Sequence, residues 1–280
     1  MADLKKVDAN GLEFAYFEEG DGPLVMLVHG FPDTAHSWDQ VRPAVAAAGY
    51  RVVTPFTRGY HPTQVPTEEA FDSDTLGRDV LAIAAALGKE GEKPILVGHD
   101  WGASAVYSAV GLAPDAIRLM ITIAIPHPAG LKPTPKLIWS VRHFFYLRRK
   151  NIARVIRREN FAYIDELVKR WSPAWDVPSD ETRAVKEALS HPGSLEAALG
   201  YYRALRPRPP ESLRRRVTVP AVSIAGTDDI LSADVFDQVR SCYAAGYDVI
   251  KMPGGHFLHR EHPERFNREL IGALEKHAPI

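Results

Sequence analysis

The sequence predicts an α/β protein that has a mostly parallel central sheet, helices on both faces of that sheet, and a helical segment inserted into the chain. In residues 12–125 and again in 217–280, short apolar runs alternate with stretches of helical character, as expected of strands alternating with helices. Residues 129–216, by contrast, have helical periodicity, many arginines and no clear strand.

The first of these stretches is expected to supply most of the sheet. Its strands are predicted at residues 12–18, 24–28, 50–54, 94–97 and 119–125, and its helices at 37–48, 73–87 and 103–110. Residues 12–18 alternate like a strand at the edge of a sheet, whereas 24–28 is wholly apolar and therefore fits a buried strand. Ser73 or Asp74 could cap the helix that runs to Leu87, with Gly88 at its end.

After the helical insertion the strand pattern returns at residues 217–224 and 247–252, and the last helix begins near Pro263. Pro126-His127-Pro128 precedes the insertion and Pro207 to Pro210 lies near its end. These breaks divide the chain into a first core part at 1–128, a helical cap at 129–216 and a second core part at 217–280. We expect the cap to cover the strand ends, where open α/β sheets bind ligands.

The predicted cap and the predicted core differ in the sign of their net charge. Residues 131–216 contain 19 Lys and Arg against 9 Asp and Glu, whereas the remainder contains 15 basic and 26 acidic residues. The spacing of the cap arginines fits a solvated helix face, and the acidity of the core argues against binding of nucleic acid. Contact between the cap of one subunit and the acidic core of another would give a homodimer, which the sequence leaves open.

Cysteine content and hydropathy indicate the compartment. The single cysteine, Cys242, allows no internal disulfide, so a cytoplasmic location is expected. The first residues lack the apolar segment of a signal peptide, and no apolar run is long enough to span a membrane.

Gly98-His99-Asp100-Trp101-Gly102 has the Gly-x-nucleophile-x-Gly form of a nucleophile elbow, with aspartate where serine is usual. The apolar run before it fits a buried strand, and the small residues after it fit a helix, so the motif falls at a strand-to-helix turn. A serine at the tip performs acyl transfer. A carboxylate instead attacks carbon directly, displaces a leaving group and leaves an ester on the enzyme. The motif therefore predicts Asp100 as a nucleophile in alkyl transfer.

Hydrolysis of such an ester needs a base that activates water and an acid that orients the base, and these follow the nucleophile in the order acid, histidine. The loop after the strand near 217–224 contains Asp228 and Asp229. The Gly-x-x-Asp spacing from Gly226 favours Asp229, but both remain candidates. His256 follows the last strand on a glycine-rich turn and is the predicted base.

The oxyanion formed during ester hydrolysis needs backbone N–H donors. One is expected from Trp101, directly after the nucleophile. The other is expected from Phe31 in the loop after strand 24–28, because the next residue, Pro32, has no N–H. No metal site is expected around His256, His259 and His262. The inverted zinc motif has the form His-x-x-Glu-His, whereas His259-Arg260-Glu261-His262 has one residue fewer, and Pro263 disrupts the helix that the motif needs.

Taken together, these residues resemble the α/β-hydrolase superfamily and, within it, the epoxide hydrolase branch. The resemblance covers nearly the whole chain. It is carried by the segments His29-Gly30-Phe31-Pro32-Asp33 with Ser37-Trp38, Arg58-Gly59-Tyr60, the elbow around Asp100, and Gly255-His256-Phe257. It implies the α/β-hydrolase fold with a helical cap, and conversion of small apolar epoxides to vicinal diols with water and no cofactor.

The resemblance also implies two cap tyrosines that donate hydrogen bonds to the epoxide oxygen. Tyr202, in Tyr201-Tyr202-Arg203, occupies the place of the second tyrosine. The place of the first tyrosine holds Phe145, with Tyr146 one residue away. Either Tyr146 serves after a shift of the alignment by one residue, or the protein has a single phenol donor.

Haloalkane dehalogenases share the aspartate elbow and are the main alternative, with Trp101 as a halide ligand. Their second halide donor is often an asparagine side chain at the position of Phe31, which phenylalanine cannot replace. Fluoroacetate dehalogenases use arginines soon after the nucleophile, and residues 103–112 contain none. A non-catalytic ligand receptor on the same fold is disfavoured by the retained carboxylate of Asp100.

Overall fold

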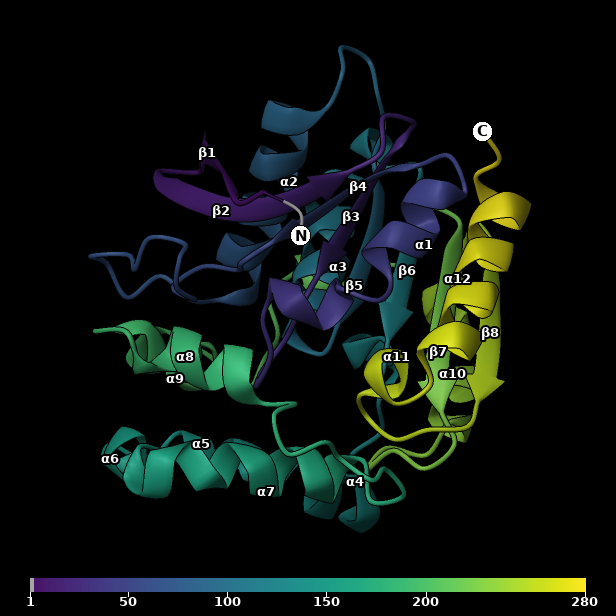
Figure 1. Ribbon diagram of the computed structural model, residues 1–280. Coiled ribbons are helices and arrows are strands. Elements are labelled where there is room, and N and C mark those ends of the chain that lie inside the picture. Colours follow the sequence, from purple (N-terminus) through teal and green to yellow (C-terminus); the bar gives the residue numbers. More distant parts are fainter. Residues whose placement is uncertain (1–2) are drawn as a thin grey trace.

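One eight-stranded sheet forms the centre of the protein in this computed structural model, which describes residues 3–280 (Figure 1). The strands are β1 (Lys5–Ala9), β2 (Leu12–Glu19), β3 (Leu24–Val28), β4 (Arg51–Pro55), β5 (Ile95–His99), β6 (Leu119–Ile123), β7 (Ala221–Gly226) and β8 (Tyr247–Met252). Their order is β1-β2-β4-β3-β5-β6-β7-β8; β1 and β2 run antiparallel to their neighbours and the other pairs are parallel. The predicted α/β class with a mostly parallel sheet is confirmed.

The position of β2 corrects the prediction that residues 12–18 form an edge strand. The edge is β1, which pairs with β2 through the register Lys5 to Tyr16. Its segment is short and mostly charged, so it carries little apolar signal, and charged side chains are a usual protection for an exposed edge.

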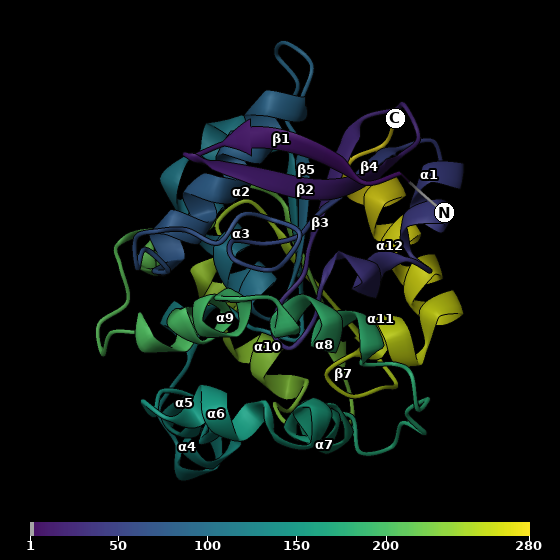
Figure 2. The same ribbon diagram turned by 60° about the vertical axis from the view of Figure 1, so that its left-hand side comes forward.

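Two pairs of helices cover the two faces of the sheet (Figure 2). The helices α2 (Ser73–Leu87) and α3 (Trp101–Leu112) pack together on one face. The helices α1 (Arg42–Ala47) and α12 (Pro263–His277) lie on the other, where Val45, Phe266 and Leu270 join the buried side of β3 and β5. Buried residues on both faces explain why the inner strands, such as β3 and β5, are apolar without alternation.

The smaller helices of the core complete this arrangement. They are η1 (Ala35–Trp38), η2 (Pro114–Ala116), η3 (Pro128–Gly130), η5 (Ser212–Arg214), α10 (Asp234–Gln238), η6 (Arg240–Cys242) and α11 (Leu258–Glu261). The helix predicted over 37–48 is therefore two pieces, η1 and α1. Thr34 caps η1 through its side chain, and Pro43 in the first turn of α1 starts a new helix.

Two further boundaries differ from the prediction. Asp72, rather than Ser73 or Asp74, caps α2, since its Oδ1 accepts from the N–H groups of Asp74 and Thr75 at 3.1 Å each. The strand predicted from residue 217 begins only at Ala221, because Pro220 has no N–H to donate to a neighbouring strand.

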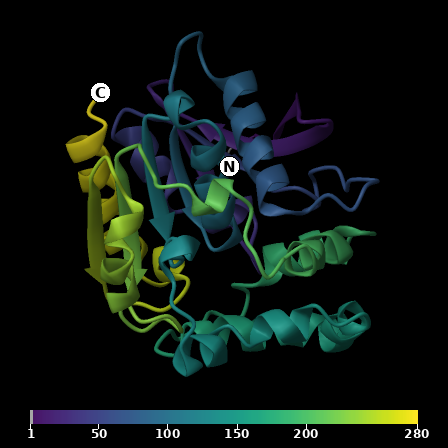
Figure 3. The same ribbon diagram turned by 180° about the vertical axis from the view of Figure 1, so that it is seen from behind.

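Between β6 and β7 the chain forms helices and no regular strand, and all of that stretch lies within the described residues. The helices are α4 (Pro135–Ser140), α5 (His143–Leu147), α6 (Ile152–Ile156), η4 (Arg158–Phe161), α7 (Ala162–Trp171), α8 (Arg183–Ser190) and α9 (Ser194–Arg203). The arrowheads of β6 and β8 point toward these helices, which lie in two rows beyond the end of the sheet (Figures 1 and 3).

No helix within residues 3–280 combines the length and the apolar character needed to cross a bilayer. Cys242 is a buried free thiol, with no second cysteine in the sequence to pair with it.

The turn between β5 and α3 is strained and tightly packed. Asp100 at its tip has φ +51° and ψ −117°, a conformation that a residue with a side chain rarely adopts. Glycine is needed on both sides, because a Cβ at Gly98 would collide with the backbone of Gly102, and a Cβ at Gly102 would collide with the Val28 carbonyl group. The turn therefore holds Asp100 at the carboxyl end of β5, between its neighbours β3 and β6.

Gly102→Ala should destabilise the protein by about 1–3 kcal/mol, because the Val28 carbonyl lies in a paired central strand and cannot move aside. Gly272→Ala is the matched control: it is exposed in α12 with no atom near its would-be Cβ, and should stabilise by about 0.5–1 kcal/mol through helix propensity. Urea unfolding measures both. Equal effects of the two substitutions would contradict this account of the elbow.

Candidate active site

Three side chains from three strand ends meet beneath the helical segment. Asp100 follows β5, Asp229 lies three residues after the end of β7, and His256 follows β8. The Nε2 atom of His256 is 3.4 Å from Oδ2 of Asp100, and its Nδ1 atom is 3.1 Å from Oδ2 and 3.2 Å from Oδ1 of Asp229. All three side chains are less than a tenth exposed. The imidazole thus bridges two buried carboxylates.

Of the two candidate acids, Asp229 is the one that reaches the imidazole. The carboxylate of Asp228 accepts hydrogen bonds from the Thr227 hydroxyl and from the backbone N–H of Gly254 instead. Asp228 therefore links the loop after β7 to the loop after β8, and its role is structural.

The electrostatics follow from this packing. Burial opposes the charged imidazole, but the carboxylates of Asp229 and Asp100 outweigh it and raise the pKa of His256 to about 10. Burial also disfavours the Asp100 carboxylate, yet the close imidazole of His256 and the hydrogen bond from the Phe31 N–H leave the pKa of Asp100 below its usual value. Both shifts favour an ionised Asp100 beside a protonated His256 in the unreacted site.

Phe31 also contacts Asp100. Its backbone N–H donates to Oδ1 of Asp100 at 2.8 Å. Gly30 makes this approach feasible, because a Cβ there would lie 2.5 Å from Oδ1 of Asp100. The backbone N–H of Trp101 belongs to the first turn of α3, where N–H groups lack a partner within the helix. Both residues predicted as oxyanion donors are therefore adjacent to the carboxylate.

Tyr202 lies beside this carboxylate within a cluster of aromatic rings. Its ring meets those of Trp101 and Phe31 edge-on, with centroids 5.1 and 5.3 Å apart, and Phe144 packs on it at 5.4 Å. Its hydroxyl is buried without a hydrogen-bond partner among the described residues. Burial and the charge of Asp100 raise the pKa of Tyr202 well above its usual value, so the phenol stays protonated.

A cavity of about 470 Å³ opens onto Asp100 and Trp101. Apolar side chains line much of it, among them Leu131, Leu137 and Phe144 from the helical segment. A cavity of this size is in the range of small-molecule sites. Its walls suit an apolar substrate, and Asp100 is the carboxylate placed beside the buried imidazole.

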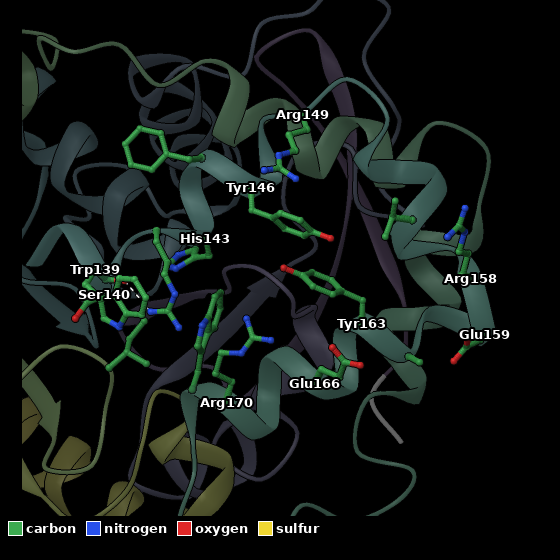
Figure 4. A pocket seen from close by; sticks show the side chains of 16 residues that line it. Trp139, Ser140, His143, Tyr146, Arg149, Arg158, Glu159, Tyr163, Glu166 and Arg170 are labelled. Carbon is green, nitrogen blue, oxygen red and sulfur yellow. Dashed lines mark hydrogen bonds between the residues drawn. The ribbon is translucent and has the colours of Figure 1, made fainter.

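Tyr146 lies elsewhere. Its ring packs against Tyr163 with centroids 5.5 Å apart, and Arg149 stacks on it at 5.0 Å. Tyr146 lines a different hollow from the one that holds Asp100 (Figure 4). Phe145, the other candidate for that position, is 66% exposed. Tyr202 thus packs against Trp101 and Phe31 next to Asp100, whereas neither Tyr146 nor Phe145 lines the cavity at Asp100.

Two residues of the helical segment that the sequence did not single out cover His256. The ring of Trp171 lies 5.1 Å from the imidazole, and its carbonyl accepts from the backbone N–H of His256 at 2.9 Å. His143 packs against Trp171 at 4.7 Å, and burial lowers the pKa of His143 to about 4. Trp171 is 85 residues from His256 in the sequence, so no local pattern points to this contact.

A cluster of buried polar residues in the core contacts the loop that carries His256. His99 Nε2 donates to the carbonyl of His256 at 2.9 Å, and Arg260 donates to Oδ1 of Asp33 at 3.0 Å. Asp33, His99 and His259 offer nitrogen and oxygen atoms within 4.8 Å of one another and are the residues that could hold a metal ion. The guanidinium of Arg260 already balances Asp33 and would oppose a cation there.

Comparisons with known proteins identify the family. A model described as "Alpha/beta hydrolase family" matches residues 25–269. The AB hydrolase superfamily protein YfhM of Bacillus subtilis is 31% identical over 281 residues, covering 96% of each chain. The chain belongs to the alpha/beta hydrolase family.

Other relatives carry more specific names. Epoxide hydrolase A of Mycobacterium tuberculosis is 26% identical, again over 96% of each chain. Among solved structures, an epoxide hydrolase of Bacillus megaterium in complex with an inhibitor superposes with a TM-score of 0.86, at 22% identity over 97% of this chain and 100% of that one. This structural likeness confirms the α/β-hydrolase fold.

We expect Asp229→Asn to lower the pKa of His256 and Asp228→Asn to leave it nearly unchanged, because of these two residues only Asp229 places a negative charge against the imidazole. An NMR titration of the His256 ring, identified by the signal missing in His256→Gln, measures this. A larger drop in Asp228→Asn would show that the loop after β7 uses the other carboxylate.

Proposed function

We propose that the protein is an epoxide hydrolase that converts small apolar epoxides to vicinal diols through an ester on Asp100. The observation that carries this proposal is the arrangement at Asp100: a buried carboxylate 3.4 Å from an imidazole, with a buried, unpaired phenol beside it. The names of the relatives, several of them epoxide hydrolases of bacteria and mammals, support the same activity.

In the first proposed step, an oxygen of Asp100 attacks a ring carbon of the epoxide and the carbon–oxygen bond opens. The leaving oxygen accepts a hydrogen bond from Tyr202 and gains a proton, which the protonated His256 supplies or, where His256 is replaced, solvent water supplies. The product of this step is a hydroxyalkyl ester of Asp100. A neutral phenol is suited to the developing alkoxide because it is a fixed donor in a dry site.

In the second proposed step, His256 acts as the base. Formation of the ester removes the charge of Asp100, so the pKa of His256 falls and the imidazole can take a proton from water. The hydroxide attacks the ester carbonyl carbon. The resulting oxyanion accepts from the N–H groups of Phe31 and Trp101. As the ester C–O bond breaks, the diol takes the proton held by His256, and the carboxylic acid left on Asp100 then gives its proton to the imidazole, which restores the starting pair. Asp229 keeps the imidazole oriented through Nδ1.

In this proposal, residues 129–216 form a cap on a core made of 1–128 and 217–280. The cap supplies Tyr202 and the apolar wall that includes Leu131 and Phe144, and it excludes water through Trp171. The mechanism uses one phenol. Tyr146 would enter it only if the cap moved to bring Tyr146 into the cavity at Asp100.

The dehalogenase alternative uses the same nucleophile but needs a halide site. Trp101 could give one donor, whereas the apolar ring of Phe31, which packs against Tyr202 at 5.3 Å, gives none. Incubation with styrene oxide and with a bromoalkane, measuring diol and bromide separately, distinguishes the two activities. We expect diol from the wild-type protein and neither product from Asp100→Asn. Bromide release without diol would overturn the proposal.

His256→Ala should accumulate the ester, seen by mass spectrometry as an increase equal to the mass of the epoxide, because alkylation proceeds and hydrolysis lacks its base. His262→Ala is the control, since His262 is exposed on the same turn and should keep full turnover. Absence of an adduct in His256→Ala, with the fold intact by circular dichroism, would contradict the two-step scheme.

Tyr202→Phe should slow ester formation by about 10²-fold, the value typical of one oxyanion-type donor. Tyr201→Phe is the matched control: Tyr201 lines the same cavity, but its hydroxyl is already engaged by the Arg58 carbonyl at 2.7 Å. Rapid-mixing measurement of the first turnover gives both rates. Equal rates in the two variants would remove Tyr202 from the site.

A further inference from the structure

A second hollow lies mainly in the helical segment, apart from the cavity at Asp100. Its volume is about 870 Å³, and it is lined by residues of α4 to α7 (Figure 4). Trp171 and His143 form part of the lining, and we call this hollow the cap groove. Apart from Trp171, which shields His256, its lining takes no part in the proposed reaction.

Aromatic side chains form much of the surface of the cap groove. Trp139 and Phe145 are 68% and 66% exposed, which is unusual for side chains of this size. Tyr146 and Tyr163 are less exposed, and in Figure 4 their rings lie alongside each other near the middle of the groove, pointing in opposite directions, with centroids 5.5 Å apart. An apolar body could therefore lie along the groove against several ring faces.

Positive charge accompanies these rings. Arg142, Arg149, Arg158 and Arg170 line the groove. Within the part of the chain that the structure describes, none of them has a carboxylate within 4.0 Å, whereas the neighbouring Arg157 forms an ion pair with Glu196 at 2.6 Å.

Two of these arginines are positioned by rings. Arg142 stacks on Trp139 at 4.3 Å and Arg149 stacks on Tyr146 at 5.0 Å, so they are held while most of their N–H donors remain available. Glu159 and Glu166 also line the groove, so the arginines outnumber the acids there by four to two.

The cap groove and the cavity at Asp100 share one wall. Ser140, Arg142 and His143 line the groove, while Val141 and Phe144 of the same segment line the cavity. The groove is thus a second compartment, separated from the first by the thickness of one helical segment.

We propose that the cap groove binds an amphipathic carboxylate, a molecule with an extended apolar body and one acidic end. The rings of Trp139, Phe145 and Tyr146 would hold the body, and the unpaired arginines would hold the carboxylate through charge-assisted hydrogen bonds. This goes beyond the proposed function, because the ligand needs no epoxide and no reaction at Asp100.

Dodecanoate, used below its micelle-forming concentration, is the probe, and calorimetry with the Asp100→Asn protein measures binding without turnover. The double variant Arg149→Gln with Arg170→Gln should weaken binding roughly tenfold or more, since each charge-assisted bond lost is strong. The double variant Arg154→Gln with Arg183→Gln removes the same charge from exposed positions outside the groove and should change the affinity little.

Dodecanol, which has the same body without the charge, should bind at least tenfold more weakly than dodecanoate, and added salt should reduce the difference. Absence of dodecanoate binding, equal weakening in the two double variants, or equal affinity for dodecanol would each overturn the proposal. Light scattering gives a further test. If the protein is a dimer and Phe145→Ser dissociates it, the proposal is also overturned, because the groove would then bind a second copy of the chain.

Discussion

The imidazole of His256 lies between the carboxylates of Asp100 and Asp229, with all three side chains almost fully buried. Two buried negative charges would be costly alone, and the protonated imidazole between them offsets much of that cost. The same arrangement makes the site responsive to chemistry at Asp100. When that carboxylate is converted to a neutral group, one of the two charges that raise the pKa of His256 is lost, and the imidazole becomes a usable base.

The fold places these groups by delivering each from the carboxyl end of a different parallel strand. Asp100 depends on a strained turn that only glycine neighbours permit, and it lies within hydrogen-bond distance of the Phe31 N–H because Gly30 has no side chain. The backbone of His256 is hydrogen-bonded on two sides: its carbonyl accepts from His99 of the core, and its N–H donates to the carbonyl of Trp171 in the helical segment. The helical segment is therefore bonded directly to the histidine loop, so the loop depends on contacts with both the core and the helices.

Much of this could be predicted from the sequence, because strong apolar runs and glycine-bounded motifs are local signals. The strand at 24–28, the strand at 247–252 and the elbow lie where they were expected. The charged strand β1 was missed because an edge strand needs little apolar character. Trp171, His143 and the separation of Tyr146 from Asp100 could not be predicted, since they depend on how helices far apart in the sequence pack. The sequence spacing favoured Asp229 over Asp228 as the partner of His256, but only the distances in the structure distinguish the two.

The central claim is that an oxygen of Asp100 becomes bonded to the substrate. A single turnover in water labelled with ¹⁸O, with enzyme in excess over styrene oxide, tests it most directly. The account predicts a diol without the label and ¹⁸O in the peptide that contains Asp100, because the first oxygen transferred comes from the carboxylate and is replaced from water. A labelled diol with an unlabelled Asp100 would mean that water attacks the epoxide itself, which would contradict the account.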